Sequence, residues 1–385
     1  MASRDTPSRP KSATQGTGPR TLLTREQRLD WLRLIRTENV GPRTFRALLN
    51  QFGGAGAALE ALPTLARRGG RLIPPQVPTR AQAETELKAL EQMGGGLIAL
   101  GERDYPPALR ALDDAPPLLA LRGRAALMGQ PMVAIVGARN ASAAGRTFAA
   151  KLARDLGEAG WVVVSGLARG IDAAAHEASL ATGTVGVFAG GLSRPYPPEN
   201  LPLIEKMAVE GAVISEMPLA WEPRARDFPR RNRLVSGLAL GVVVVEAAER
   251  SGSLITARLA GEQGREVFAV PGSPLDPRAG GANRLLKQGA TLVTEARDVV
   301  DVLAPMIGRE NEEGEVSAPR PPMEPVAPGD DARARIVELL GPVPTLIDDL
   351  VRLSGRSAAE VQIVLLELDL AGRLDRPGTG RVALK

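Results

Sequence analysis

Two hydrophobic segments in the middle of this chain end in small residues that are followed by arginine. The segments are residues 132–136 and 161–164, and the groups that follow are Gly137 and Arg139 after the first and Ser165, Gly166 and Arg169 after the second. Backbone amides, a hydroxyl and guanidinium groups gathered at such turns can all donate hydrogen bonds to an anion. This chemistry suits phosphate far better than an acyl or glycosyl substrate.

A third group of cations lies before the hydrophobic segment 242–245. Residues 222–233 hold five arginines against Glu222 and Asp227, so the local charge is 5 − 2 = +3. We expect this stretch to be a loop, and a dense basic loop is typical of a protein with a polyanionic partner. A charge run on its own more often forms a solvated face, so the run is informative only together with the other groups. Its candidate contacts are Arg230, Arg231, Asn232 and Arg233.

Two further groups have an ordinary structural explanation as well as a chemical one. Ser251, Ser253 and Thr256 open a predicted helix, where hydroxyls and amides either bind a phosphate or simply cap the helix. Asp172 and His176 are four residues apart on another predicted helix and can therefore contact each other. No nucleophile lies beside this pair, which favours a structural hydrogen bond over acid–base catalysis.

Several kinds of site are excluded by the sequence. The chain has no cysteine and a single histidine, which removes thiol catalysis and histidine-rich metal sites. The turn after residue 137 does not read Gly-x-Gly-x-x-Gly, and neither a Gly-x-x-x-x-Gly-Lys-Ser/Thr loop nor a Gly-x-Ser-x-Gly nucleophile elbow occurs. We therefore expect no metal, no cofactor and no enzymatic activity.

The composition sets the size and compartment of the protein. A chain of 385 residues that is 44% hydrophobic but only 3% aromatic can form two or three domains with cores of alanine, valine, leucine and isoleucine. The N-terminus has no signal-peptide pattern, and no apolar run approaches the ~20 residues of a membrane span. We expect a cytoplasmic protein with no membrane contact.

Strand-like and helix-like segments alternate between residues 130 and 304. The expected strands are 132–136, 161–165, 184–189, 212–215, 241–246, 266–270 and 291–293, and the expected helices are 142–158, 171–181, 198–210, 253–263, 282–288 and 296–303. This pattern predicts an α/β domain of Rossmann-like, doubly wound type, with a mainly parallel sheet covered by helices on both faces. In such a sheet a ligand binds at the carboxyl ends of the strands, where the candidate residues would meet.

Shorter units flank this domain. The expected organisation is a disordered tail (1–20), a small α-helical domain of helix-hairpin-helix or SAM-like type with its connector (21–125), the Rossmann-like domain (126–305), a linker (306–330) and a separate winged-helix domain (331–385). The third helix of the winged helix, residues 358–371, carries acidic side chains and no basic one. That is poor chemistry for a DNA groove, which favours a contact with a protein partner.

The motifs together resemble one family. The chain is similar to the DNA-processing protein DprA (Smf) family in the order and spacing of 135–139, 165–172 with His176, 196–197, 215–216, 228–233, 245–247, 251–256 and 270–272. Many members have lysine where this chain has Arg169, which keeps the charge and changes the geometry. Weaker likeness extends to both flanking domains.

The resemblance implies a protein that binds single-stranded DNA without reacting with it. Members protect incoming DNA during natural transformation and recombination, help to load the RecA recombinase, and form homodimers through the Rossmann-like domain. Carried over to this chain, the DNA contacts are Gly137, Arg139, Ser165, Gly166, Arg169, Arg230, Arg231, Asn232 and Arg233.

Two other functions stay open at this point. One is a nucleotide-processing enzyme, because a related Rossmann group hydrolyses nucleoside monophosphates; the Pro-Gly-Gly-x-Gly-Thr run of that group is not matched by Pro271-Gly-Ser-Pro here. The other is a regulator that binds duplex DNA through the winged helix. Side-by-side binding of single strand, duplex and mononucleotide would separate the three.

Overall fold

A computed structural model describes residues 22–307, 328–378 and 380–385. The chain forms two compact units. The central unit holds Glu86–Ala115 and the residues from Leu119 to the end of the α/β domain, and the terminal unit holds Leu23–Thr85 and the C-terminal residues. The expected tail (1–20) and most of the expected linker lie outside the described residues.

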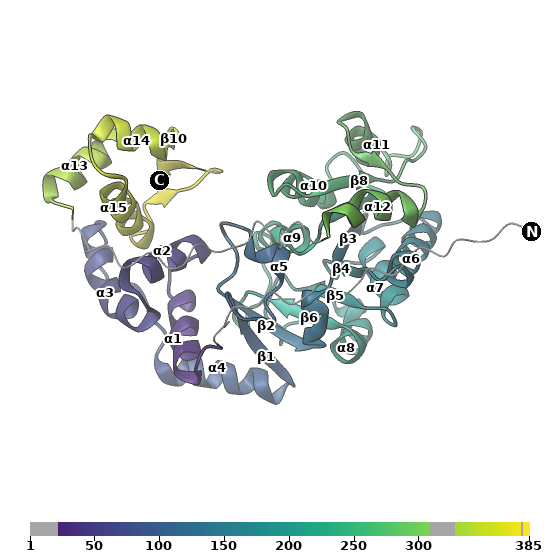
Figure 1. Cartoon of the computed structure of the whole chain (residues 1–385), viewed down its shortest axis with the longest axis horizontal. Helices are drawn as coiled ribbons and strands as arrows, with labels where there is room; N and C mark the ends of the chain where they lie inside the picture. Colours follow the sequence, from purple (N-terminus) through teal and green to yellow (C-terminus); the bar gives the residue numbers. More distant parts are fainter. Residues whose placement is uncertain (1–21, 308–327, 379) are drawn as a thin grey trace, which may run out of the picture. The chain divides into compact units, whose positions relative to one another are not determined.

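The central unit is built on a nine-stranded sheet (Figure 1). Its strands are β1 (Gly95–Ala99), β2 (Leu118–Gly123), β3 (Met132–Gly137), β4 (Val162–Ser165), β5 (Thr184–Val187), β6 (Ala212–Ser215), β7 (Gly241–Val245), β8 (Glu266–Ala269) and β9 (Thr291–Leu292). Its helices are α4 (Arg80–Gln92, shared with the terminal unit), α5 (Pro107–Arg110), α6 (Ala143–Glu158), α7 (Ile171–Ser179), α8 (Leu201–Glu210), α9 (Asp227–Leu238), α10 (Gly252–Glu262), α11 (Gly280–Lys287) and α12 (Ala296–Leu303). Short 3₁₀ turns lie at Ala125–Gly129, Pro198–Asn200 and Ala304–Met306.

The strand order is β1-β2-β6-β5-β4-β3-β7-β8-β9. Each pair from β6 to β9 is parallel, and β2 pairs antiparallel with β6. The predicted doubly wound, mainly parallel α/β fold is therefore confirmed. The sheet begins earlier in the chain than the expected boundary at residue 126, because β1 and β2 belong to it.

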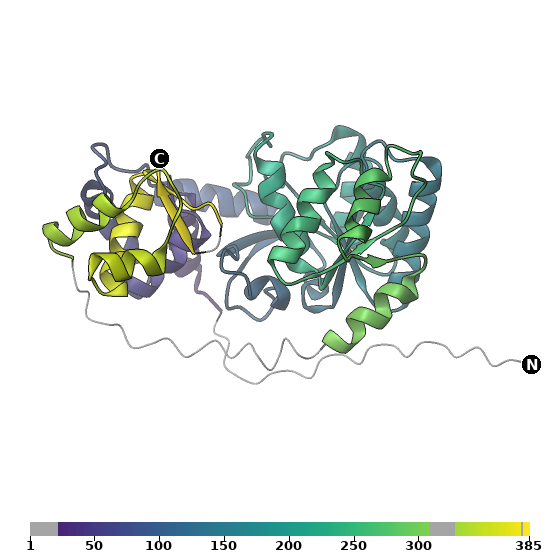
Figure 2. The same ribbon diagram turned by 90° about the horizontal axis from the view of Figure 1, so that it is seen from above.

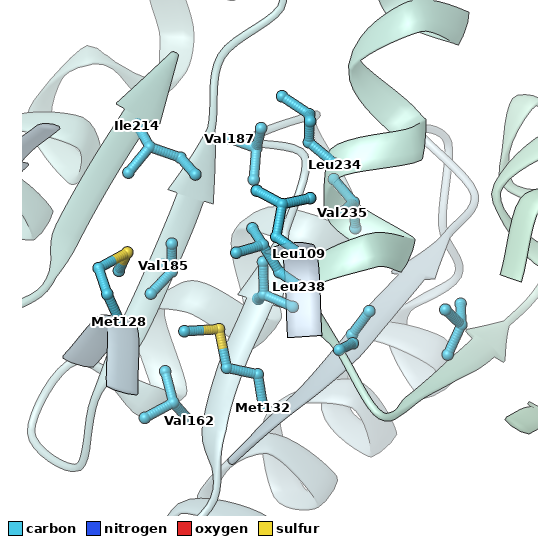
Figure 3. Close-up of a cluster of buried hydrophobic side chains, with 14 of the residues drawn as sticks. Leu109, Met128, Met132, Val162, Val185, Val187, Ile214, Leu234, Val235 and Leu238 are labelled. Atoms are coloured by element: carbon cyan, nitrogen blue, oxygen red, sulfur yellow. The ribbon is translucent and has the colours of Figure 1, made fainter. Parts of the chain in front are cut away.

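The two faces of the sheet bury alternate residues of each strand, as the pleat requires. In β3, Met132, Ala134 and Val136 enter one core, and Val133 and Ile135 enter the other. Leu234, Val235 and Leu238 of α9 pack on the first face, as Figure 3 shows. Helices α6, α7 and α12 supply the second core, so helices cover both faces (Figure 2). This double cover explains why the strands are valine-rich throughout.

The arginine run 228–233 forms the start of α9 and is not the expected loop. Asp227 begins the helix, and its carboxylate accepts hydrogen bonds from the amide of Arg224 at 2.8 Å and the indole of Trp221 at 2.9 Å. An acidic residue and a proline, Pro229, are both well tolerated in a first helical turn. The apolar residues that fix the helix on the sheet come only after the run, from Leu234 onward.

The terminal unit joins the two ends of the chain. It contains α1 (Arg25–Arg36), α2 (Pro42–Phe52) and α3 (Ala55–Arg68), then α13 (Asp330–Leu339), β10 (Thr345–Leu346), α14 (Ile347–Ser354), α15 (Ala358–Leu370), β11 (Leu374–Asp375) and β12 (Arg381–Leu384). The last six elements form the winged helix, with a small sheet of order β10-β12-β11. This domain is not the separate unit that the sequence suggested, because Leu366 and Leu370 of α15 share a core with α1–α3.

Candidate functional site

A crevice of about 730 Å³ opens at the carboxyl ends of β3, β4 and β7. It lies where the connections from β3 run to one side of the sheet and those from β7 to the other, the usual ligand position in a doubly wound fold. Its lining includes the turn after β3, the turn after β4, one face of α9 and the start of α10. The polar and charged residues among these are Arg139, Asn140, Asp172, Arg231, Asn232, Arg250, Ser251, Ser253, Thr256 and Arg278.

Three arginines give the mouth of the crevice its charge. Arg139 and Arg250 are exposed, and neither forms an ion pair with any residue in the described ranges. Arg278 is held by Asp276, whose two carboxylate oxygens accept from Nε at 3.0 Å and Nη2 at 2.9 Å. These bonds raise the pKa of Arg278 above its usual value. Arg139 and Arg250 are therefore free to bind an anion, and Arg278 adds an oriented positive charge.

An aromatic side chain lies among these cations. The guanidinium of Arg139 is 5.4 Å from the ring centroid of Phe228, a cation–π distance. The Phe228 ring also contacts the ring of Tyr196 edge to face, with 5.7 Å between the two ring centroids. Arg169 lines a narrow extension of the crevice with Tyr196, and its Nη1 is 3.4 Å from Glu199. The surface thus offers both charge and a flat apolar face.

A buried charge pair forms the floor of the crevice. Arg231 donates through Nη1 to the carbonyl of Gly166 and, at 2.5 Å, to the carbonyl of Val187. Burial lowers the pKa of Arg231 to about 10. The carboxylate of Asp172 accepts from the amides of Gly166 at 3.1 Å and Ala168 at 3.2 Å, and burial raises its pKa despite Arg231 and these bonds.

This pair changes how the turn after β4 can act. The amide of Gly166 is already donated to Asp172, so it is not a free phosphate donor. A Cβ atom at residue 166 would lie 2.8 Å from the guanidinium carbon of Arg231, so a larger residue there would displace the Arg231 side chain. Arg231 and Asp172 thus fix the shape of the turn after β4 from the interior of the protein. The exposed residues at the mouth of the crevice are then the ones available to a ligand.

His176 does not bond to Asp172, contrary to the expectation from their spacing. Its Nδ1 is 2.7 Å from Thr184 Oγ1, and its Nε2 is buried without a hydrogen-bond partner. Burial, followed by the charge of Arg231, lowers the pKa of His176 to about 3, so the ring is neutral. His176 therefore has a structural role as a buried imidazole packed between α7 and β5. Asp172 instead accepts hydrogen bonds from the amides of the loop that precedes α7.

The helices that follow β3 and β7 differ in what already occupies their N-termini. The first, at α6, is occupied by the carboxylate of Glu246, which accepts from the amide of Ser142 at 2.9 Å and from its hydroxyl. The second, at α10, is capped by Ser251, whose hydroxyl lies 2.7 Å from that of Ser253. Both serines and Thr256 line the crevice. A ligand phosphate can therefore approach α10, whereas α6 already has its anion.

The helical geometry of α9 separates its arginines. Arg231 and Asn232 face the crevice with Phe228, while Arg230 and Arg233 point to the buried Glu216. Arg233 also bonds to the carbonyl of Asp114 at 2.8 Å and is almost fully buried. The expectation that all four polar residues of this run face a ligand is corrected, since successive helical residues are 100° apart.

The remaining expected residues divide in the same way. Gly137 lines the crevice, and Ser165 is fully buried with its hydroxyl donated to the carbonyl of Ile135 at 2.6 Å. Sequence reasoning missed Arg250 and Arg278. Only their positions in the sequence could have indicated them as site residues. Arg250 precedes the serines at the start of α10, and Arg278 lies in the glycine-rich loop that leads into α11.

No group of three metal-binding side chains occurs among the residues that the structure describes. Within the same residues, no helix has the length and apolarity needed to cross a bilayer.

Three parts of this chain match models of known protein families. Residues 96–304 match the family model of DNA recombination-mediator protein A, residues 25–89 match a DprA-like N-terminal HHH domain, and residues 319–378 match a DprA winged helix domain. DNA processing protein DprA of Bacillus subtilis is 45% identical over 220 residues, covering 56% of this chain and 74% of that protein.

Two solved structures share the fold. DNA processing protein A from Streptococcus pneumoniae is 32% identical, with a TM-score of 0.59 over 70% of this chain and 95% of that chain. DNA processing protein A from Helicobacter pylori, described for its single-stranded DNA binding mode, is 30% identical, with a TM-score of 0.51 over 55% of this chain and 96% of that chain.

Proposed function

This chain belongs to the DNA recombination-mediator protein A family, and from that membership we propose that it binds single-stranded DNA in the crevice without catalysing a reaction on it. The observation that carries the proposal is the mouth of the crevice, where Arg139 and Arg250 are exposed beside the start of α10 and form no ion pair with any residue that the structure describes. Guanidinium groups and helix N-terminal amides are the groups that bind backbone phosphates.

The proposed contacts follow from what each residue already binds. Arg139, Arg250 and Arg278 hold phosphates together with Ser251 and the amides at the start of α10, and Arg169 extends the track toward Tyr196. Phe228 offers its ring to a base, because stacking on an aromatic face is tolerant of sequence. Asn232 lines the same wall. Gly137, Gly166 and Arg231 shape the floor, whereas Ser165, Arg230 and Arg233 are engaged elsewhere.

The biological role that we propose is protection of incoming DNA and help in loading a RecA-type recombinase during natural transformation and recombination. The family's description as a recombination mediator supports this role. We also propose that the chain acts as a homodimer through the central unit. Neither step needs catalysis, and no histidine lies among the described residues that line the crevice to activate a serine or threonine there.

Paired arginine variants test the site. Arg139→Ala and Arg250→Ala each remove an exposed cation that has no ion-pair partner among the described residues, so each should weaken binding of a labelled single strand by about 1–3 kcal/mol. Arg230→Ala is the matched control, because it removes an exposed arginine from the other face of α9 and should change affinity much less. Fluorescence anisotropy with single strand, duplex and mononucleotide measures all three.

Two results would contradict the proposed function. If Arg139→Ala and Arg250→Ala fold normally and bind single strand as well as the unchanged chain, the crevice is not the DNA site. Nucleotide hydrolysis that is lost with Asp172→Ala would instead indicate an enzyme.

A further inference from the structure

The third helix of the winged helix, α15, is apolar on two opposite sides. Val361, Val364, Leu365 and Leu368 pack inside the winged helix itself. Leu366 and Leu370 are 3% and 0% exposed, yet they belong to the core that α1–α3 form. A helix that is hydrophobic all round is buried on all sides, and here the second cover comes from the other end of the chain (Figures 1 and 2).

The backbones of α3 and α15 come into direct contact. Gly69 ends α3 in an ordinary helical conformation, with φ of −69°. A Cβ atom at this position would lie 1.9 Å from the carbonyl oxygen of Glu367. Only glycine therefore permits this approach, and the reason is the neighbouring helix and not the local backbone conformation.

The end of α15 is completed by the N-terminal helices. Three of its last four carbonyls accept from the amides of residues 371–373, which follow it directly. The fourth, that of Leu370, accepts from Asn39 Nδ2 at 3.3 Å and Arg71 Nη1 at 3.5 Å. In return, Arg373 donates to the carbonyl of Gly69 at 3.1 Å. Terminal carbonyls of a helix need such partners, and α15 obtains one of them from another domain.

The charges of α15 are unsuited to a nucleic acid. Glu367 is buried in a two-bond contact with Arg333, at 2.8 and 3.0 Å, and Asp369 is held by Arg376 at 2.7 Å. The helix has no basic residue. A carboxylate-bearing helix in a DNA groove would be repelled by the phosphates.

We propose that α15 is a protein-docking helix whose partner is the chain's own N-terminal helical domain, so that the winged helix is fixed to α1–α3 and does not read duplex DNA. The contact uses the helix that winged-helix proteins commonly place in a groove. The two terminal domains then act as one composite module.

Thiol labelling tests the docking in the full chain, which has no cysteine of its own. Three single-cysteine chains are needed: Leu366→Cys on the docked side of α15, Leu365→Cys on the side facing the winged-helix core, and Leu353→Cys, an exposed position on α14. We expect fast labelling at residue 353 and slow labelling at 365 and 366. Labelling at 366 as fast as at 353 would overturn the proposal.

Gly69→Ala then opens the contact selectively. It should speed labelling at residue 366 by about tenfold or more, through local opening, and leave residue 365 protected. Gly56→Ala is the matched control on the same helix, because a Cβ there meets only an ordinary 3.5 Å contact with Asp30. It should leave both rates unchanged. If Gly69→Ala also left residue 366 protected, the docked arrangement would be refuted.

Duplex binding distinguishes docking from concealment of a DNA-reading helix. Gly69→Ala should change affinity for a duplex oligonucleotide by less than about twofold, because α15 carries no cation even when uncovered. An increase of more than about tenfold would show that a reading helix had been covered, and would refute the role assigned to α15.

Discussion

At the scale of single residues, burial determines what each arginine of the site can do. Arg139 and Arg250 are exposed and have no ionic partner among the described residues, so their charge is available to a ligand. Arg231 is buried with Asp172, and Arg233 with Glu216, so these charges hold the protein together. In the sequence these arginines are chemically identical, and only their surroundings in the structure separate ligand contacts from structural ones.

Loss of Arg231 should therefore affect stability more than loss of Arg139. Arg231→Met leaves the buried carboxylate of Asp172 without its compensating charge, which typically costs about 3–5 kcal/mol. Urea unfolding of Arg231→Met, Arg139→Ala and the double variant Arg231→Met/Asp172→Asn measures this. Arg139→Ala should lose little, and the double variant should recover part of the loss. Equal stability of Arg231→Met and the unchanged chain would contradict the assigned role.

His176 gives the protein a defined acid sensitivity. Its pKa is lowered from 6.5 to about 3 by burial, so between these values the unfolded chain binds a proton that the folded chain does not. Stability should then fall as pH falls below about 6.5, with a limiting slope of about 1.4 kcal/mol per pH unit.

The slope can be assigned because the chain has one histidine. Imidazole is the side chain whose ordinary pKa lies closest to this range, so His176 is the main group expected to change stability between pH 6 and pH 5. The raised pKa of Asp172 acts with the opposite sign, because it favours the folded state as pH falls. His176→Asn can keep the bond to Thr184 without accepting a proton, so its free energy of unfolding should be nearly flat over this range. An unchanged slope in that variant would assign the titration to other groups.

At the scale of elements, the N-termini of α6 and α10 should respond differently to substitution. Glu246→Gln removes the anion at the start of α6 and should cost about 1 kcal/mol of stability, because the helix dipole loses its compensation. Single-strand affinity should stay within about twofold, since this N-terminus is not a ligand site. Thermal unfolding and anisotropy measure the two effects, and a severe loss of affinity in a folded variant would contradict this view.

Sequence patterns predicted elements well where one residue type repeats. The valine-rich strands β3, β4 and β7 and their following helices lie within a few residues of their expected positions. The sequence of α9 favours a loop because its first turns carry proline and arginine. The sequence of α3 does not indicate a helix clearly, because its small residues and internal proline obscure its apolar side. Strand β2 pairs with β6, a segment about 90 residues later, which no local pattern reveals.

The sequence predicted only those site residues that directly follow a predicted strand or begin the next helix. Gly137, Arg139 and Ser251 were expected and do line the crevice. Arg250 and Arg278 were not expected, since nothing in their neighbourhood separates them from other surface arginines. Their role depends on which loops the sheet topology brings together.

At the scale of the whole molecule, DNA binding should depend on the central unit alone. A crevice that engages about three to five phosphates predicts a log–log salt slope of about −2 to −3.5 for single-strand affinity. Removal of residues 308–385 should leave the slope nearly unchanged, because α15 has no cation to contribute. Anisotropy titrations from low to high salt measure it. A slope near zero, or one that collapses on truncation, would place the strand elsewhere.

The same truncation should have a cost in solubility. It removes Leu366 and Leu370 from the core that they share with apolar residues of α3, including Leu62 and Leu65. Light scattering should show self-association of the shortened chain at concentrations where the full chain is monodisperse, since exposed apolar patches promote association.

The joining of the two chain ends also sets an order of events during synthesis. Gly69 and Arg373, which bond across the composite module, are 304 residues apart in sequence. At roughly 5–20 residues per second, the N-terminal helices leave the ribosome about 15–60 s before their partner exists. Throughout that interval α3 presents an uncovered apolar side to the cell, while the central unit is emerging. The N-terminal helical domain is therefore completed only after the central unit has been translated, and we expect the nascent chain to be a substrate for ribosome-associated chaperones.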